Sequence, residues 1–235
     1  MPTKSHHALI QGLLLFLLNA LALLVVFHFT RLNELVSRYY FDPGLPGFPL
    51  RQDPLLKYWL HDALRKVLWL SPLAVSALYV HSMYTSRWSL SSKRWVWLLL
   101  AQGAAVLAVS LLKVHTSPIC PWDQKQFGGA TDEPLFAFVS SLHAGHCFPA
   151  GHPSGGWALL AYAYFWRDTK PSLARWAFYV ALALGALMAW VQIARGAHLL
   201  SHVLWSLWVC WLVVWLAYQC CWPKPVLSVS AGHQR

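Results

Sequence analysis

Two short segments each bring a histidine to a turn beside an apolar helix. Residues 147–156 read Cys-Phe-Pro-Ala-Gly-His-Pro-Ser-Gly-Gly and place His152 at the start of the apolar run 157–166. The first N–H groups of a helix have no partner within it and can bind anions. Pro153 suits a first turn because that position needs no N–H. His152 could therefore exchange a proton with an anion held by these amides. The alternative is a capped transmembrane helix with a histidine near the interface.

Cationic and histidine side chains in two further segments suit the cleavage of a phosphate ester. Lys113 opens a basic segment, and Arg195 precedes a turn that carries His198 and His202 four residues apart. Cleaving a phosphomonoester needs cations and amides for the phosphoryl oxygens, a nucleophile, and an acid for the leaving oxygen. The candidate cations are Lys113, Lys125 and Arg195, and the candidate amides are those around Gly151. The side chains of His152 and His198 are left for the two remaining roles, nucleophile and acid.

The composition is that of a membrane protein. The 235 residues are 57% hydrophobic and only 11% charged, which is too apolar for an ordinary soluble surface, and the length suits a single domain over 1–235. A helical span needs ~20 apolar residues. Five uncharged stretches are long enough, or nearly so: 8–30, 67–84, 95–112, 176–194 and 196–222. A shorter stretch, 153–166, makes six. We therefore expect an all-α polytopic membrane protein with six transmembrane helices, the first of them retained rather than cleaved as a signal peptide.

The distribution of charge predicts the orientation. Two short loops, 86–94 and 167–175, hold six Lys or Arg and one acid, Asp168, so they should face the cytoplasm together with both chain termini. The segments with the chemistry then lie on the outer face, which we expect to be the periplasmic face of a bacterial inner membrane. Residues 55–65 have the spacing of an amphipathic helix lying in the interface before the second span. The net charge of +10 is a basic excess spread over short loops between apolar spans, as membrane orientation requires, so nucleic acid is not an expected partner.

The span that starts at Pro153 is short. Its 14 residues cover about 21 Å at about 1.5 Å per residue, against a hydrocarbon core of about 30 Å. Its N-terminus should therefore begin below the outer surface, where a polar helix start must be buried in protein or line a wet cavity. A site for a lipid headgroup would have to be built in this way.

In chain order, three motifs resemble those of the type 2 phosphatidic acid phosphatase superfamily. Its patterns are Lys-x6-Arg-Pro, Pro-Ser-Gly-His and Ser-Arg-x5-His-x3-Asp. This chain has Lys113 with Cys120-Pro121, then Pro149-Ala150-Gly151-His152, then Arg195 to His202. The resemblance covers roughly residues 95–220. It implies a six-helix membrane phosphatase in which His198 forms a phosphohistidine while His152 protonates the leaving alkoxide and then activates water. It implies no metal and no cofactor.

Four positions depart from the family motifs. Cys120 and Gln192 replace arginines, Ala150 replaces the serine, and His202 replaces the aspartate that orients the nucleophilic histidine in the family. The candidate substitutes for the lost guanidinium groups are Arg195 and Lys125. Since His202 can at best accept a hydrogen bond, either a loop carboxylate takes over or the enzyme is slow or inactive. The candidate carboxylates are Asp123, Asp132 and Glu133.

Other functions stay open at this point. A phosphotransferase would use the same residues, and a zinc site could draw on a cluster of histidines and cysteines. Its candidate ligands are His198, His202, His143, His146, Cys147 and Cys120. A non-catalytic scaffold or transporter would leave the convergence of histidines and lysine as coincidence. The histidines outside the motifs are expected at the interface or in the core: His28, His61 and His81.

The resemblance also places Cys120 near Cys147, because the family's first two motifs converge on one phosphate. The expected outer face is oxidising in a bacterial cell, so the two can form a disulfide that closes a loop of about 28 residues. The alternative is a pair of reduced thiols beside the site. The expected substrate is a lipid phosphate or diphosphate in the outer leaflet of the bilayer. Phosphatidic acid, a polyprenyl diphosphate, phosphatidylglycerol phosphate and a lipid A phosphate all offer the same headgroup to these residues.

Overall fold

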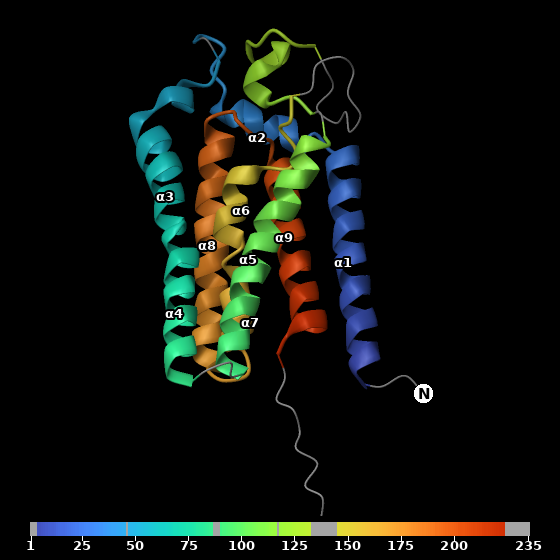
Figure 1. Cartoon of the computed structure of the whole chain (residues 1–235). Helices are drawn as coiled ribbons and strands as arrows, with labels where there is room; N and C mark the ends of the chain where they lie inside the picture. The colour runs from blue at the N-terminus through green and yellow to red at the C-terminus, as the bar shows by residue number, and fades with distance from the viewer. Residues whose placement is uncertain (1–3, 46, 87–89, 117, 133–144, 224–235) are drawn as a thin grey trace, which may run out of the picture.

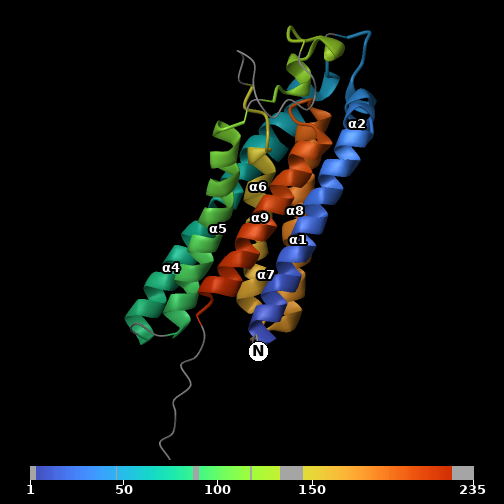
Figure 2. The ribbon, with the colours of Figure 1, turned by 90° about the vertical axis from the view of Figure 1, so that its right-hand side faces the viewer.

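Helices dominate the computed structural model, which describes residues 4–45, 47–86, 90–116, 118–132 and 145–223. The long ones run roughly side by side (Figure 1, Figure 2). They are α1 (Lys4–Phe29), α4 (Leu70–Ser86), α5 (Leu90–Val114), α8 (Pro171–Ala194) and α9 (Leu200–Cys221). Their sequences are apolar almost throughout, as expected for helices whose outer surface meets lipid instead of water.

Five helical stretches of the described residues are long and apolar enough to cross a membrane: His6–Phe29, Leu55–Thr85, Ser92–Val114, Pro171–Ala194 and Leu200–Cys221. The expected stretch 153–166 is instead two shorter helices, α6 (Gly151–Trp157) and α7 (Leu160–Trp166). They follow one another beside α8 (Figure 1). The prediction of a helical membrane protein is confirmed, whereas the count of six spans is not.

The segment before the second expected span is helical, but it does not form a separate element. The short helix η1 (Pro49–Gln52) leads to a π-helix, η2 (Leu55–Ala63), which continues through α3 (Leu64–Leu68) toward α4. These residues belong to the candidate span Leu55–Thr85, so an interfacial position for 55–65 is not confirmed. π-helical turns are rare and are frequent at functional sites.

A helix that the apolar stretches do not predict, α2 (Leu32–Tyr40), fixes the start of α9. Its buried Asn33 donates from Nδ2 to Ser201 Oγ and accepts the Ser201 N–H at Oδ1, both at 2.9 Å. Because the first N–H groups of a helix have no partner within it, Asn33 acts as a cap that a distant segment supplies. The pair ties α2 to the helix that begins just after His198.

Small residues let α6 approach α8 closely. A Cβ added to Gly156 would lie 2.7 Å from both the N and the Cα of Gly185, and the ring of Trp157 covers Gly185. Membrane helices associate through such close approach of small residues. Helices α5 and α9 complete the same buried cluster with Leu98, Val109, Val203 and Cys210. This packing fixes α6 and, with it, the segment that carries His152.

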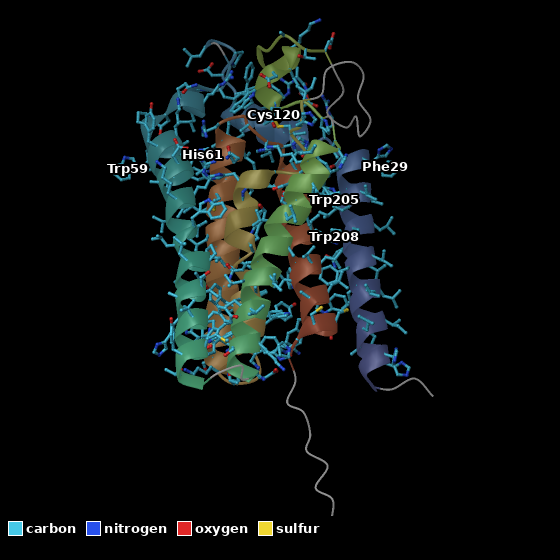
Figure 3. The ribbon with its side chains drawn as sticks, viewed as in Figure 1. Phe29, Trp59, His61, Cys120, Trp205 and Trp208 are labelled. Carbon is cyan, nitrogen blue, oxygen red and sulfur yellow. A yellow bond between two sulfur atoms is a disulfide. The ribbon has the colours of Figure 1, made fainter. Side chains whose placement is uncertain are left out.

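The segments that carry the motif residues gather at one end of the helices. The short helices η3 (Pro121–Asp123) and η4 (Lys125–Phe127) lie with α2, η2 and the starts of α6 and α9 at the upper end of Figure 1. Figure 3 places His61 and Cys120 at this end too. The N-terminal end of α1 and the basic loop 167–170 lie at the opposite end. The length of the helices therefore separates that loop from the motif segments.

Candidate active site

The turn that carries His198 follows from the way α8 ends. Gly196 has a left-handed φ of 73°, and its N–H donates to the Ile193 carbonyl while the Ala197 N–H donates to the Gln192 carbonyl, both at 2.9 Å. These two bonds form a Schellman cap, which favours glycine at its left-handed position. The ring of Phe48 occupies the space where a Cβ of residue 196 would be. The chain therefore reverses at Gly196 and sets His198 against the 147–150 segment.

Lys113 and Gly151 bring the first two motifs together. Lys113 lies in the last turn of α5, and a Cβ added to Gly151 would be only 3.9 Å from its Nζ. The ammonium group of Lys113 therefore lies beside the start of α6. The Ala150 N–H donates to the His202 carbonyl at 3.2 Å, and Ser206 Oγ donates to the Ala150 carbonyl at 2.8 Å. The backbone of Ala150 therefore anchors α6 to α9.

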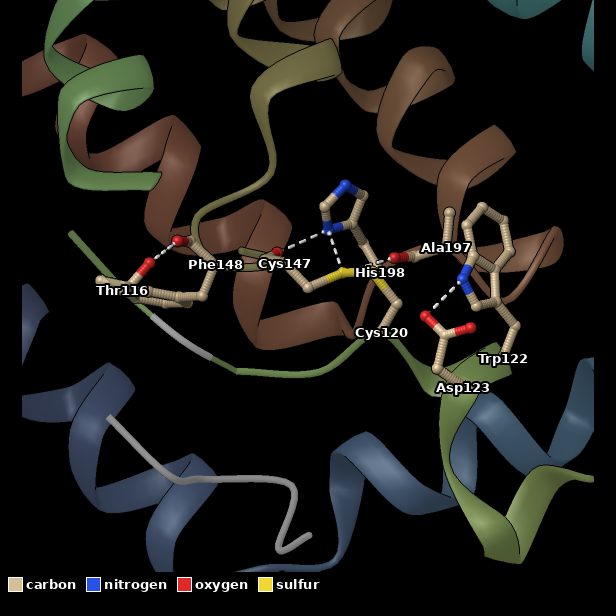
Figure 4. The surroundings of a disulfide bond; sticks show 8 residues. All are labelled: Thr116, Cys120, Trp122, Asp123, Cys147, Phe148, Ala197 and His198. Carbon is tan, nitrogen blue, oxygen red and sulfur yellow. Dashed lines mark hydrogen bonds between the residues drawn. A yellow bond between two sulfur atoms is a disulfide. The ribbon is translucent and has the colours of Figure 1, made fainter. Parts of the chain in front are cut away.

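His198 is buried and hydrogen-bonded through one ring nitrogen. Its Nδ1 lies 2.8 Å from the carbonyl oxygen of Cys147 (Figure 4). A carbonyl only accepts, so the proton of the neutral imidazole is on Nδ1 and the lone pair is on Nε2. Burial lowers the pKa of His198 well below its usual range, and the nearby His202 and Lys113 lower it further. At neutral pH the ring is therefore uncharged, with an unprotonated Nε2.

Cys120 and Cys147 form a disulfide next to His198, with their Cα atoms 5.3 Å apart. The sulfur of Cys147 lies 2.9 Å from the Ala197 carbonyl oxygen and 3.5 Å from His198 Nδ1 (Figure 4). A disulfide sulfur has no proton, so its contact with the Ala197 carbonyl is a packing contact. The disulfide thus lies in contact with the ring of His198, the nucleophile of the family pattern.

His152 meets a histidine that the motifs do not include. The ring of His61, from η2, stacks on that of His152 with centroids 3.9 Å apart, and His61 Nδ1 lies 2.8 Å from Asp62 Oδ1. Within the described part of the chain, His152 Nε2 is buried without a hydrogen-bond partner. The sequence suggested an interfacial or core role for His61. Its only signal there was the neighbouring Asp62, because the contact joins segments about 90 residues apart.

Arg195 is buried at the same end, where its Nε donates to the carbonyl of Arg51 at 3.1 Å. Its charge interacts electrostatically with His61 and His152. His198 and His152 also interact electrostatically with each other. Together with Lys113, the site therefore holds two cations and two histidines around the start of α6, which are the groups that phosphate cleavage needs.

The structure leaves several other candidates outside this group. Lys125 is exposed and lies 3.4 Å from Asp132, and exposed Asp123 accepts a bond from Trp122 Nε1 at 2.9 Å. Neither of these carboxylates contacts His198. His146 Nδ1 lies 2.9 Å from the Thr116 carbonyl oxygen. Two further candidates, Glu133 and His143, lie outside the described residues.

His202 is buried beside His198, with ring centroids 5.9 Å apart, and its Nδ1 has no hydrogen-bond partner among the described residues. Donor atoms of His198, His202 and Cys147 lie within 4.8 Å of one another. A structural zinc site uses four ligands and the thiolate form of cysteine. Since Cys147 is in a disulfide, it offers no thiolate, and the two remaining histidines are too few ligands for a zinc ion.

None of the curated proteins or solved structures compared with the chain matches it. A family model does match, and its residues include every motif segment described above. The match to the PAP2 superfamily extends over residues 94–225, more than half of the sequence, and the chain therefore belongs to that superfamily.

Proposed function

We propose that this protein is a membrane lipid phosphatase that hydrolyses a lipid phosphate or diphosphate through a phosphohistidine on His198. The observation that carries the proposal is the hydrogen bond from His198 Nδ1 to the Cys147 carbonyl. It leaves a lone pair on Nε2 of a ring on which the charge of Lys113 acts, while Arg195 acts on the neighbouring His152. Membership of the PAP2 superfamily supports phosphoester hydrolysis as the kind of reaction.

In this mechanism Nε2 of His198 attacks the phosphorus, and the bond from phosphorus to the lipid oxygen breaks. Lys113 and Arg195 stabilise the charge on the phosphoryl oxygens. His152 donates a proton to the leaving alkoxide and then accepts one from the water that attacks the phosphohistidine. Inorganic phosphate leaves and the nitrogen of His198 is restored.

The membrane helices support a lipid substrate. Apolar side chains cover the outer faces of α1, α4 and α5, including Leu14, Leu18, Leu73, Leu78 and Leu107, and such faces suit lipid contact. In the proposed orientation the motif end faces outward from a bacterial inner membrane, with both termini in the cytoplasm. The substrate then enters from the outer leaflet with its headgroup at the start of α6.

Phosphate release by the purified protein in detergent micelles tests the proposal. The substrates are phosphatidic acid, a polyprenyl diphosphate, phosphatidylglycerol phosphate and a lipid A phosphate. We expect His198→Ala and His152→Ala each to abolish turnover, because nucleophile and acid act as a unit. The matched control is His81→Ala, since His81 is exposed on α4 and lies outside the motifs.

Substrate labelled in the transferred phosphoryl group identifies the intermediate. Label on His198 supports the mechanism, and label on any other residue overturns it. Transfer of the label to an added alcohol in preference to water would identify the phosphotransferase alternative. Loss of activity in chelator that zinc restores would favour the metal alternative.

A further inference from the structure

Among the described residues, no carboxylate partners His198 as the aspartate of the family pattern would. The position of that aspartate is His202, and neither Asp123 nor Asp132 contacts the His198 ring. Instead, the Cys147 carbonyl accepts the Nδ1 proton at 2.8 Å. We infer that this backbone carbonyl has taken over the orienting role of the aspartate, and that the Cys120–Cys147 disulfide is the device that holds it in place. This inference rests on the proposed function of His198.

A carbonyl oxygen can perform the geometric part of the aspartate's task. It accepts one N–H bond, so it fixes the ring plane and keeps the proton on Nδ1, as a carboxylate would. It carries no net charge, so it stabilises the imidazolium of the phosphohistidine less than a carboxylate does. The protein therefore keeps the tautomer that the reaction needs and gives up part of the electrostatic stabilisation.

The position of the carbonyl is set by contacts on both sides of Cys147. Its N–H donates to the Pro118 carbonyl at 2.9 Å, its sulfur is bonded to Cys120, and the same sulfur packs on the Ala197 carbonyl at 2.9 Å. On the Cys120 side, the Trp122 N–H donates to the Gly196 carbonyl at 3.0 Å. The disulfide therefore joins a segment tied to residue 196 to the residue that orients His198.

His202 does not perform this role in the structure. The His198 Nδ1 proton is already bonded to Cys147, and the two imidazole rings are inclined by 74° with their centroids 5.9 Å apart. The ring of Phe148 packs edge-on against that of His202, with centroids 5.5 Å apart. His202 is nevertheless close enough that a carboxylate at its position can compete for the same proton. That proximity provides a rescue experiment.

Three variants test the inference, each measured for kcat and KM on the best substrate: Cys120→Ser/Cys147→Ser, the same pair with His202→Asp, and the control Cys220→Ser/Cys221→Ser. The control removes two exposed cysteines at the end of α9. We expect the first variant to lose about 10- to 100-fold in kcat with little change in KM, the usual cost of losing an orienting partner. Adding His202→Asp should restore most of the loss, and the control should match the wild type.

Reduction of the folded wild type gives the same comparison without a substitution. Dithiothreitol converts the disulfide to two thiols and is itself oxidised to a cyclic disulfide. We expect kcat of the wild type and of the Cys220→Ser/Cys221→Ser control to fall together as both thiols become open to alkylation. This arm also decides the question if the double serine variant fails to fold, which thermal unfolding would reveal.

The tautomer is observed directly by ¹⁵N NMR of histidine-labelled protein, with His198→Ala used to assign the signals. We expect Nδ1 protonated in the wild type and a mixture of tautomers after reduction. Protonated Nε2 in the wild type would overturn the inference. So would full activity without the disulfide, or a loss that His202→Asp leaves unrepaired. Because this readout needs no turnover, a protein with the expected tautomer but no phosphatase activity would refute the proposed function alone.

Discussion

The imidazole of His61 lies flat against that of His152, with ring centroids 3.9 Å apart and planes inclined by 18°. On its other edge His61 binds the carboxylate of Asp62 at 2.8 Å. In the described residues His152 Nε2 has no hydrogen-bond partner, so packing on His61 sets the plane of the proposed acid. The π-helical turn of η2 thus supplies a surface on which His152 is positioned.

Removing that surface should impair turnover without removing a motif residue. We expect His61→Ala to lower kcat by about 10²-fold, since a misplaced catalytic group can cost that much. His61→Phe keeps a flat ring and should retain most of the wild-type kcat. The measurement is steady-state kinetics, with His81→Ala as control. An equal loss in the phenylalanine and alanine variants would show that the imidazole itself carries protons.

The two lysines proposed for phosphate binding should differ sharply. Lys113 lies beside Gly151, whereas Lys125 is exposed and paired with Asp132. We expect Lys113→Ala to reduce kcat/KM by about 10²-fold or more, as for loss of one group that stabilises developing charge. Lys125→Ala should leave kcat/KM unchanged. A comparable loss in both variants would mean that the 125–132 segment moves onto the substrate.

The activity should persist to unusually low pH. Burial lowers the pKa of His198 well below its usual range, with smaller contributions in the same direction from His202, Lys113 and His61, while the hydrogen bond to Cys147 opposes them. The nucleophile is therefore protonated only below about pH 6.5, the ordinary value for histidine. We expect the acidic limb of the kcat–pH profile to lie below that value.

The sign of the shift can be tested at residue 202. A carboxylate near His198 favours its protonated form and raises its pKa. His202→Asp should therefore move the acidic limb to higher pH, while His81→Asp on the exposed face of α4 should leave it in place. An acidic limb that stays at the same pH in His202→Asp would contradict the assignment of this limb to His198.

The sequence indicates the parts of the site that depend on side-chain type. Lys113, Gly151 and His198 belong to motifs that the charge of the loops predicts on one face of the membrane, and the structure brings Lys113 beside Gly151 and close enough to act on His198. Lys125 is a candidate phosphate-binding cation by its charge alone. The sequence does not reveal that Lys125 is exposed and paired with Asp132.

Other parts left no signal in the sequence. The acceptor for His198 is a backbone carbonyl, which a residue of any type at position 147 would carry. The stack of His61 on His152 depends on a π-helical turn and on the path of the chain between them. The cap of Asn33 on α9 likewise joins residues 168 positions apart. Such contacts arise from tertiary packing rather than from local residue patterns.

The close approach of α6 to α8 gives a prediction about stability that also affects the site. A Cβ at residue 156 would lie 2.7 Å from backbone atoms of Gly185. Backbone cannot rotate away as a side chain can, so α6 must shift. We expect Gly156→Ala to destabilise the protein by about 1–3 kcal/mol, the usual range for overpacking, and to lower kcat because α6 carries His152.

Gly103→Ala is the matched control, because this glycine lies within α5 and an added Cβ would meet nothing within 4 Å. Alanine is favoured over glycine in a helix by about 1 kcal/mol, so this variant should be neutral or slightly stabilised, with wild-type kcat. Thermal unfolding in detergent and steady-state kinetics measure both effects. If the two variants unfold at the same temperature, the Gly156–Gly185 contact is not what fixes α6. The position of His152 must then depend on the hydrogen bonds of Ala150 to α9 and on the stack with His61.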